Sequence, residues 1–164
     1  MDWGNIHFDD YARALPFESL VGQTIVELIA LTTDNKGNLV ECVVGAETEV
    51  LILKTASGDY YRLYHEVDEC DHDAWLEDVT GDMDDLLNSP IITAYESSSS
   101  NDAAPIIPPP NDRMHDDSWT WTFYRIQTAK GCITMRWYGT SNGYYSESVD
   151  LTKGTLKEAQ SNER

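Results

Sequence analysis

Cysteine is scarce in this sequence, and long hydrophobic runs are missing from it. The three cysteines, Cys42, Cys70 and Cys132, are odd in number and far apart, which argues against a disulfide framework and for a reducing compartment. No apolar run approaches the roughly 20 residues that a helix needs to cross a bilayer. The first residues also lack the basic patch and apolar stretch of a secretory signal. We therefore expect a cytoplasmic protein without a membrane partner.

Lysine and arginine are absent from residues 63–112, which carry thirteen acidic residues. This stretch has a net charge of −13, whereas residues 1–62 carry −6, residues 113–164 carry +1 and the whole chain carries −18. Such a field repels nucleic acid and anionic membranes, and it attracts cations or basic protein surfaces. Direct binding to DNA or RNA is thus the least expected activity, and a basic protein surface is the most expected partner.

The residues that are present predict one mainly β domain, with an α+β fold as the alternative. With 164 residues, 41% of them hydrophobic, the chain can form a single core. Branched and aromatic residues predict an antiparallel sheet or barrel-like domain with strands near residues 24–31, 39–44, 49–54, 59–64, 90–95, 119–128, 132–138 and 144–149. Short helices are expected near residues 9–15 and 82–88.

Two segments are expected to lie outside the packed sheet. The Ser- and Pro-rich residues 96–118 predict a flexible loop within the domain, because such a composition favours extended, unpaired backbone. Residues 153–164 are polar and predict a fraying tail after a domain that spans residues 1–152.

Two motifs carry a resemblance to a known family. The first is Gly-Asp-x-x-Asp-Leu at residues 81–86, and the second is Arg-Trp-x-Gly-x-Ser-Asn-Gly-Tyr-Tyr-Ser-Glu at residues 136–147. Together they resemble a family of small proteins, found mostly in bacteriophages, that is described only as a domain of unknown function. The likeness runs from about Gly22 to Val149. The resemblance implies a phage origin and therefore a location in the host-cell cytoplasm. It also implies an all-β or α+β fold, and it transfers no activity.

One departure from that family concerns a short acidic segment. In the family a hairpin is usually followed by a His, an Asp and two adjacent cysteines. Here His65 and Asp68 match, but Glu69 and Cys70 stand where the cysteine pair would be. Chemistry that depends on two neighbouring thiolates is therefore not expected.

Metal-binding and catalytic signatures are weak in this sequence. His65, Cys70 and His72 lie within eight residues, but their spacing is irregular for a zinc site. The favoured interpretation is a surface histidine pair beside a packed thiol. The carboxylates do not form a twelve-residue calcium loop. There is no Gly-x-Ser-x-Gly elbow and no Gly-rich phosphate loop. We therefore predict a protein that is not an enzyme, with no catalytic residue, metal or cofactor; a metal-dependent hydrolase is the weakest hypothesis.

The first functional hypothesis uses the acidic stretch as a binding surface. Negative charges packed so densely repel one another and destabilise the folded state, and this cost suggests that they serve a function. Carboxylates on a rigid β scaffold can present charge as a nucleic-acid backbone does. We predict a phage protein that inhibits a host nucleic-acid-handling defence protein of the restriction or CRISPR type. The predicted partner-binding residues are Asp68, Glu69, Asp71, Asp73, Glu77, Asp78, Asp82, Asp84 and Asp85.

The alternative hypothesis is a small-molecule or nucleotide binder that sequesters a signal. Eight of the seventeen aromatic residues lie between residues 119 and 145, where they can pack a core or form a cleft in which rings stack. At period two, Trp119, Trp121 and Phe123 share one face of a strand, and Tyr124 lies on the other. Core packing is the favoured interpretation. For the cleft, the predicted ligand-binding residues are Arg125, Arg136, Trp137, Tyr138 and Tyr144.

Overall fold

The fold of the chain is given by a computed structural model. It describes residues 3–9, 13–45, 47–66, 72–100, 118–143 and 146–157, with Ser99 and Ser100 described by their backbone alone. Ten strands are found in these ranges: β1 (Ile6–Phe8), β2 (Ile25–Thr33), β3 (Leu39–Glu41), β4 (Val50–Thr55), β5 (Tyr60–Tyr64), β6 (His72–Thr80), β7 (Thr93–Ser100), β8 (Ser118–Gln127), β9 (Cys132–Ser141) and β10 (Asp150–Leu156). Three short 3-10 helices accompany them: η1 (Trp3–Asn5), η2 (Phe17–Leu20) and η3 (Met83–Leu86).

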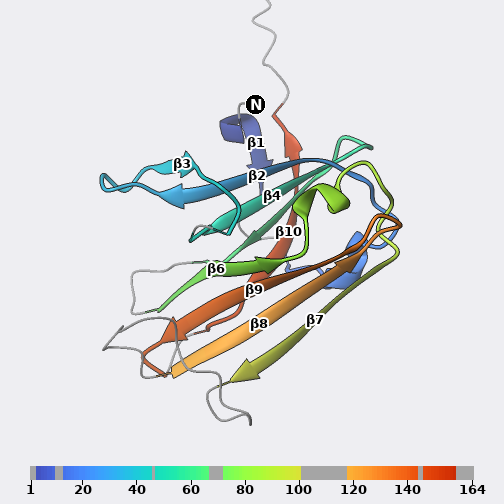
Figure 1. The fold of residues 1–164 in the computed structure, drawn as a ribbon. Helices are drawn as coiled ribbons and strands as arrows, with labels where there is room; N and C mark the ends of the chain where they lie inside the picture. Colours follow the sequence, from blue (N-terminus) through green and yellow to red (C-terminus); the bar gives the residue numbers. More distant parts are fainter. Residues whose placement is uncertain are drawn as a thin grey trace, which may run out of the picture.

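The strands form two antiparallel sheets. One has the order β1-β10-β5-β4-β2-β3, and the other has the order β6-β9-β8-β7. Figure 1 shows the four-stranded sheet as a twisted layer in front of and below the larger one. An isolated bridge joins Thr48, just before β4, to Leu76 of β6, and another joins Ile25 of β2 to Leu87, just after η3. The result is a curled, half-barrel arrangement, as the mainly β composition predicts.

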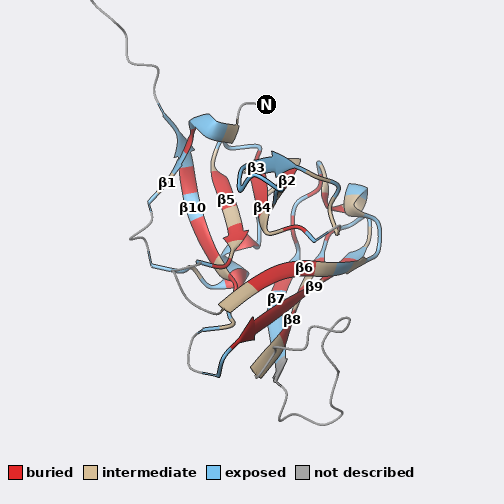
Figure 2. Ribbon diagram, turned by 90° about the vertical axis from the view of Figure 1, so that its left-hand side faces the viewer, coloured by how far each residue is buried: buried red, intermediate tan, exposed pale blue. Residues whose placement is uncertain are grey.

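The main core fills the space between the two sheets. Figure 2 shows that the strands of the two layers run in clearly different directions and that buried residues lie on both layers. The larger sheet contributes Leu51 and Leu63, the smaller one contributes Met135 and Trp137, and all four are fully buried. Apolar side chains that alternate along each strand are therefore removed from water on one face, which is the main stabilising contribution to such a layered fold.

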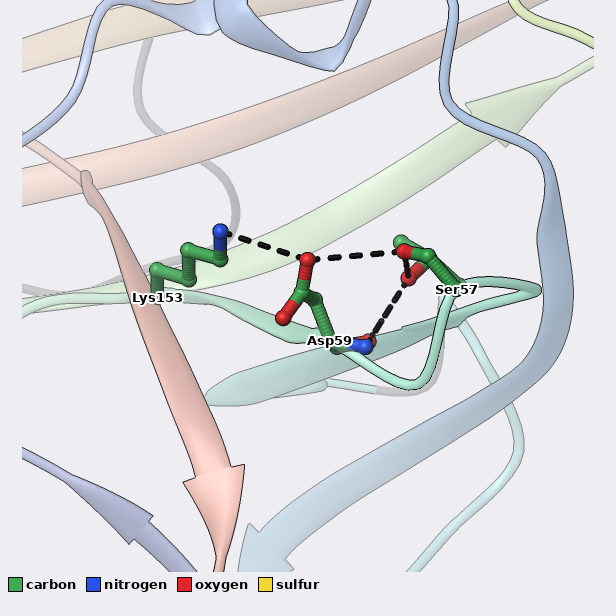
Figure 3. A network of polar contacts seen from close by, with 4 residues as sticks. Ser57, Asp59 and Lys153 are labelled. Atoms are coloured by element: carbon green, nitrogen blue, oxygen red, sulfur yellow. Dashed lines mark hydrogen bonds and ion pairs between the residues drawn. The ribbon is translucent and has the colours of Figure 1, made fainter.

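The β4–β5 hairpin turn is held by a small polar network. The Thr55 hydroxyl donates to the Asp59 carbonyl at 3.0 Å and lies 2.9 Å from the Ser57 hydroxyl. The Asp59 carboxylate accepts from Ser57 at 3.4 Å and pairs with Lys153 of β10 at 3.2 Å (Figure 3). Because the ion pair is partly exposed, it contributes little stability, but it joins the turn to the neighbouring strand in the sheet.

The structure differs from the sequence-based predictions in several elements. The loop predicted from residue 96 begins later, because β7 continues to Ser100 in register with β8. The tail predicted from residue 153 is strand as far as Leu156, paired with β1 and β5. Residues 72–80, within the acidic stretch, form a strand, β6, that the sequence did not predict. Within the helix predicted at 9–15, residues 13–15 are not helical, and residues 10–12 lie outside the described ranges.

Candidate functional site

The predicted acidic binding residues follow one strand and the 3-10 helix after it. Six of them lie in the described ranges, on β6 or within or beside η3: Asp73, Glu77, Asp78, Asp82, Asp84 and Asp85. We call these six the acidic edge, because β6 is one of the two edge strands of the four-stranded sheet. The other three lie outside the described residues: Asp68, Glu69 and Asp71. The structure thus brings the described part of the predicted surface together along one rim.

Several carboxylates of the acidic edge also hold the local structure. Asp82 accepts a hydrogen bond from the backbone N–H of Asp84 at 2.9 Å and so caps η3. Glu77 accepts from the indole N–H of Trp75 at 2.9 Å. Asp73 accepts from the N–H of the next residue at 2.8 Å. Replacing any of these three would perturb the fold as well as the charge.

Asp78 and Asp84 of the acidic edge are exposed, and they lie on β6 and η3 respectively. The hydroxyl of Thr128, in the β8–β9 turn, donates to the carbonyl of Asp85 at 2.6 Å. The ammonium of Lys130 donates to the carbonyl that ends η3 at 2.7 Å. These two hydrogen bonds connect η3 to the β8–β9 hairpin, so the backbone that carries Asp84 is held in place by its neighbours.

The residues of the predicted aromatic cleft do not share one face. Trp137 is fully buried in the core between the sheets. Its neighbours Arg136 and Tyr138 therefore point to the opposite, outer face of β9, because successive strand residues alternate. Arg125 of β8 shares that outer face, and Tyr144 lies outside the described residues. The structure thus brings together three of the five residues and separates Trp137 from them.

Arginine and aromatic side chains are stacked on this outer face. The guanidinium of Arg136 lies 4.8 Å from the ring centre of Trp121. The guanidinium of Arg125 lies 5.3 Å from the ring centre of Phe123 and 5.7 Å from that of Tyr95. Such cation–π contacts stabilise the guanidinium groups in place. Tyr95 is 48% exposed, so part of this face is accessible.

A cleft that the sequence analysis did not predict opens on the inner side of the same sheet. Its volume is about 700 Å³, which is within the usual range for small-molecule sites. Its walls come from β7, from β8, from Gly143 and residues 146–151, and from Ala14, Leu15 and Phe17. The polar groups that line it are mainly hydroxyls and carboxylates, from Glu96, Ser98, Ser118, Thr120, Thr122, Tyr124, Ser146, Glu147, Ser148 and Asp150. We call it the β7–β8 cleft.

The ionisable groups of the β7–β8 cleft perturb one another. Burial raises the pKa of Tyr124, and the negative charge of Glu96 and a hydrogen bond with it raise it further. The Tyr124 hydroxyl therefore stays protonated, and it donates to the carbonyl of Val149 at 3.2 Å. Burial also raises the pKa of Asp150, while the nearby His65 lowers it. Two acidic groups, the half-buried Asp150 and the exposed Glu96, thus lie near Tyr124 at one end of the cleft.

The second sequence motif builds one wall of this cleft. Glu147 accepts hydrogen bonds from Thr120 at 2.8 Å and from Ser141 at 2.6 Å, so both of its carboxylate oxygens are used. The Ser141 hydroxyl in turn accepts from the N–H of Gly143 at 3.0 Å. A Cβ atom at Gly139 would lie 2.1 Å from the Glu147 carbonyl. Only glycine allows this backbone to approach β9 so closely.

The histidines considered as metal ligands are in direct contact with each other. Nε2 of His65 lies 2.5 Å from Nδ1 of His72, and Nδ1 of His65 lies 2.6 Å from the carbonyl oxygen of Ser148. In the first contact one ring nitrogen donates and the other accepts. Over the ranges that the structure describes, no three His, Cys, Asp or Glu side chains gather in a way that could hold a metal ion. The pair therefore links β5, β6 and the segment before β10.

A family model described as a domain of unknown function, DUF7448, matches residues 18–151. The chain belongs to this family. The match runs from η2 to the beginning of β10, and it covers the acidic edge and most of the residues that line the β7–β8 cleft. No curated protein and no solved structure gives a significant match. Among the described residues, no helix of this DUF7448 protein is long and apolar enough to cross a membrane.

Proposed function

We propose that this protein is a non-enzymatic binding protein that attaches to a basic surface of another protein through its acidic edge. The observation that carries the proposal is the placement of Asp78 and Asp84, both exposed, on a strand and a 3-10 helix that the β8–β9 hairpin supports. Like charges held on a rigid scaffold attract an oppositely charged partner protein from as far as about one Debye length, and they fix the orientation of that partner on contact. The net charge of −18 steers such an encounter.

The chemistry of the partner follows from this arrangement. Phosphates present negative charge at regular intervals along a nucleic-acid strand, and β6 and η3 present exposed carboxylates of the same sign along one edge of the sheet. A protein that binds DNA or RNA through Lys and Arg therefore offers a matching surface. The resemblance of the two motifs to phage proteins supports a phage origin, and a host defence protein of the restriction or CRISPR type is then the target that we propose, bound and inhibited by mimicry.

A matched pair of charge-reversal variants tests the proposal. Asp78→Lys with Asp84→Lys changes the acidic edge without touching the Asp82 cap or the Glu77 contact with Trp75. Glu18→Lys with Glu41→Lys is the control, because both residues are exposed and neither belongs to the acidic edge; they lie on η2 and β3. Both double variants change the net charge by the same amount. Each is immobilised, challenged with host lysate at low and high salt, and the eluate is analysed by mass spectrometry.

We expect the wild type and the control to retain the same nucleic-acid-binding protein at low salt and to release it at high salt. The variant at the acidic edge should lose at least tenfold in affinity, because like charges then face the partner. Circular dichroism of each variant checks that the sheets remain folded. Equal retention by both double variants would show that general charge, and not the acidic edge, attracts the partner.

A second candidate function is the binding of an anionic ring compound, such as a nucleotide, on the outer face of the smaller sheet. The observation that favours it is the pair of stacked guanidinium groups, Arg136 on Trp121 and Arg125 on Phe123. An aromatic surface that carries fixed guanidinium groups can pair with phosphate and stack on a base. This function predicts a rise in melting temperature with nucleotides that Arg125→Ala reduces; no rise with any nucleotide would exclude it.

A further inference from the structure

The β7–β8 cleft follows the length of one strand. Ser118, Thr120, Thr122 and Tyr124 are alternate residues of β8 and all line it. At about 3.4 Å per residue, the cleft extends roughly 20 Å along β8, from Ser118 to Tyr124. The cleft is therefore a long channel rather than a round hole, and this shape favours an extended ligand.

Carboxylates lie near both ends of this channel. Glu147 is fixed 2.8 Å from the Thr120 hydroxyl. Glu96 is paired in register with Tyr124, four residues further along β8. The charge of Asp150 also acts on Tyr124. The two carboxylate groups are thus separated by roughly 13 Å of strand, and the Thr122 hydroxyl lies between them.

Basic side chains are absent from the described lining of the channel, and the histidine that acts on Asp150, His65, does not line it. Among the described residues that line it, none is a lysine, an arginine or a histidine. Carboxylates and hydroxyls accept hydrogen bonds from N–H donors. Glu147 and Asp150 are half-buried and Glu96 is exposed, so the first two gain more from a bound cation than the third does. The channel therefore selects a positively charged ligand with N–H groups and disfavours an anion.

Two other ligand classes fit less well. A sugar would need an open ring face on which to stack, but Phe17 and Tyr124 are each only 2% exposed and contact each other edge to face, with ring centres 4.7 Å apart. A divalent cation needs several oxygen ligands around one point. The carboxylates of the channel lie at opposite ends of it, and no three candidate ligands converge among the described residues.

We propose that the β7–β8 cleft binds a linear polyamine, with one terminal ammonium group at Glu147 and the other at Glu96 and Asp150. The carbon chain between them runs along β8, past the Thr122 hydroxyl. This site is separate from the acidic edge, because none of its three carboxylates belongs to that edge. Loss of partner binding and loss of polyamine binding are therefore independent outcomes.

Isothermal titration of the full-length protein with putrescine, spermidine and spermine at low salt tests this site. Because the two carboxylate groups are far apart, affinity should rise at least tenfold from the short diamine to the tetraamine. Glu96→Gln with Asp150→Asn removes two charges from one end of the channel and leaves the Glu147 hydrogen bonds in place. We expect this variant to lose at least tenfold in spermine affinity and to bind spermine no better than spermidine.

The control is Asp78→Asn with Asp84→Asn, which removes the same charge from the acidic edge. It should bind spermine within twofold of the wild type. Equal losses in the two double variants would overturn the proposal, since they would show attraction by net charge alone. Displacement of spermine by magnesium at equal ionic strength would overturn it as well, and so would the absence of measurable binding.

Discussion

At the scale of single residues, Gly139 determines whether the wall of the β7–β8 cleft can form. A methyl group there would meet the carbonyl oxygen of Glu147 at 2.1 Å and its carbonyl carbon at 2.9 Å. These are backbone atoms, which cannot rotate away as a side chain can. We expect Gly139→Ala to lower the free energy of unfolding by about 3 kcal/mol, at the upper end of the cost of overpacking, as measured by urea denaturation.

Gly37→Ala is the control for this prediction. Gly37 has a φ of +82° in the β2–β3 turn, and a Cβ atom there would have no neighbour within 4 Å. Its replacement should therefore cost only the backbone strain of the left-handed region, about 1 kcal/mol. If Gly139→Ala cost no more than Gly37→Ala, the close approach of the segment around Glu147 to β9 would be wrong.

At the scale of elements, the sequence predicted the strands that are rich in branched and aromatic residues. β2, β4, β5, β8 and β9 are of this kind, and each lies close to its predicted range. β6 was missed because carboxylates surround its three consecutive buried residues, Ala74 to Leu76. A bulge after Leu76 also interrupts its alternation. Charge on an edge strand thus hides the period of two on which such predictions depend.

The β7–β8 cleft could not be predicted for a different reason. Its carboxylates, Glu96, Glu147 and Asp150, come from segments about fifty residues apart, and only the pairing of β7 with β8 and the approach of Glu147 to Gly139 bring them together. The acidic edge was predictable because its residues are close in sequence. What a sequence shows directly is local charge, whereas a cleft depends on register and on the packing of segments between strands.

A prediction at the same scale concerns the end of β10. Lys153 and Gly154 pair with β5, and Gly154 to Leu156 pair with β1. A chain that stops at residue 152 would therefore lose the support of β1 and the Lys153–Asp59 ion pair. We expect it to unfold at a melting temperature at least 5 °C below that of the full chain, since about 2 kcal/mol corresponds to such a shift in a domain of this size.

The matched control is a chain that stops at Lys157, which keeps every one of those strand pairs. It should melt within about 2 °C of the full chain. Thermal denaturation followed by circular dichroism measures both truncations. A chain ending at residue 152 that melted like the full one would show that the second half of β10 adds nothing to the sheet.

At the scale of the whole molecule, the net charge of −18 should oppose folding at low salt. Like charges held close together in the folded state repel one another, and raising the salt from 0.01 M to 1 M shortens the Debye length from about 30 Å to about 3 Å. Screening of about 1 kcal/mol of repulsion would raise the melting temperature by roughly 3 °C. We expect a rise of this size in sodium chloride, measured by differential scanning calorimetry.

The location of the repulsion can be tested with the same two double variants that test partner binding. If the repulsion is concentrated along the acidic edge, Asp78→Lys with Asp84→Lys should remove more of the salt dependence than Glu18→Lys with Glu41→Lys, although the net charge changes equally. Both variants should also melt higher than the wild type at low salt. Identical salt dependence in the two variants would mean that the charges act as one diffuse field. The acidic edge would then be no more strained than the rest of the surface, and its clustering would provide no argument for a binding role.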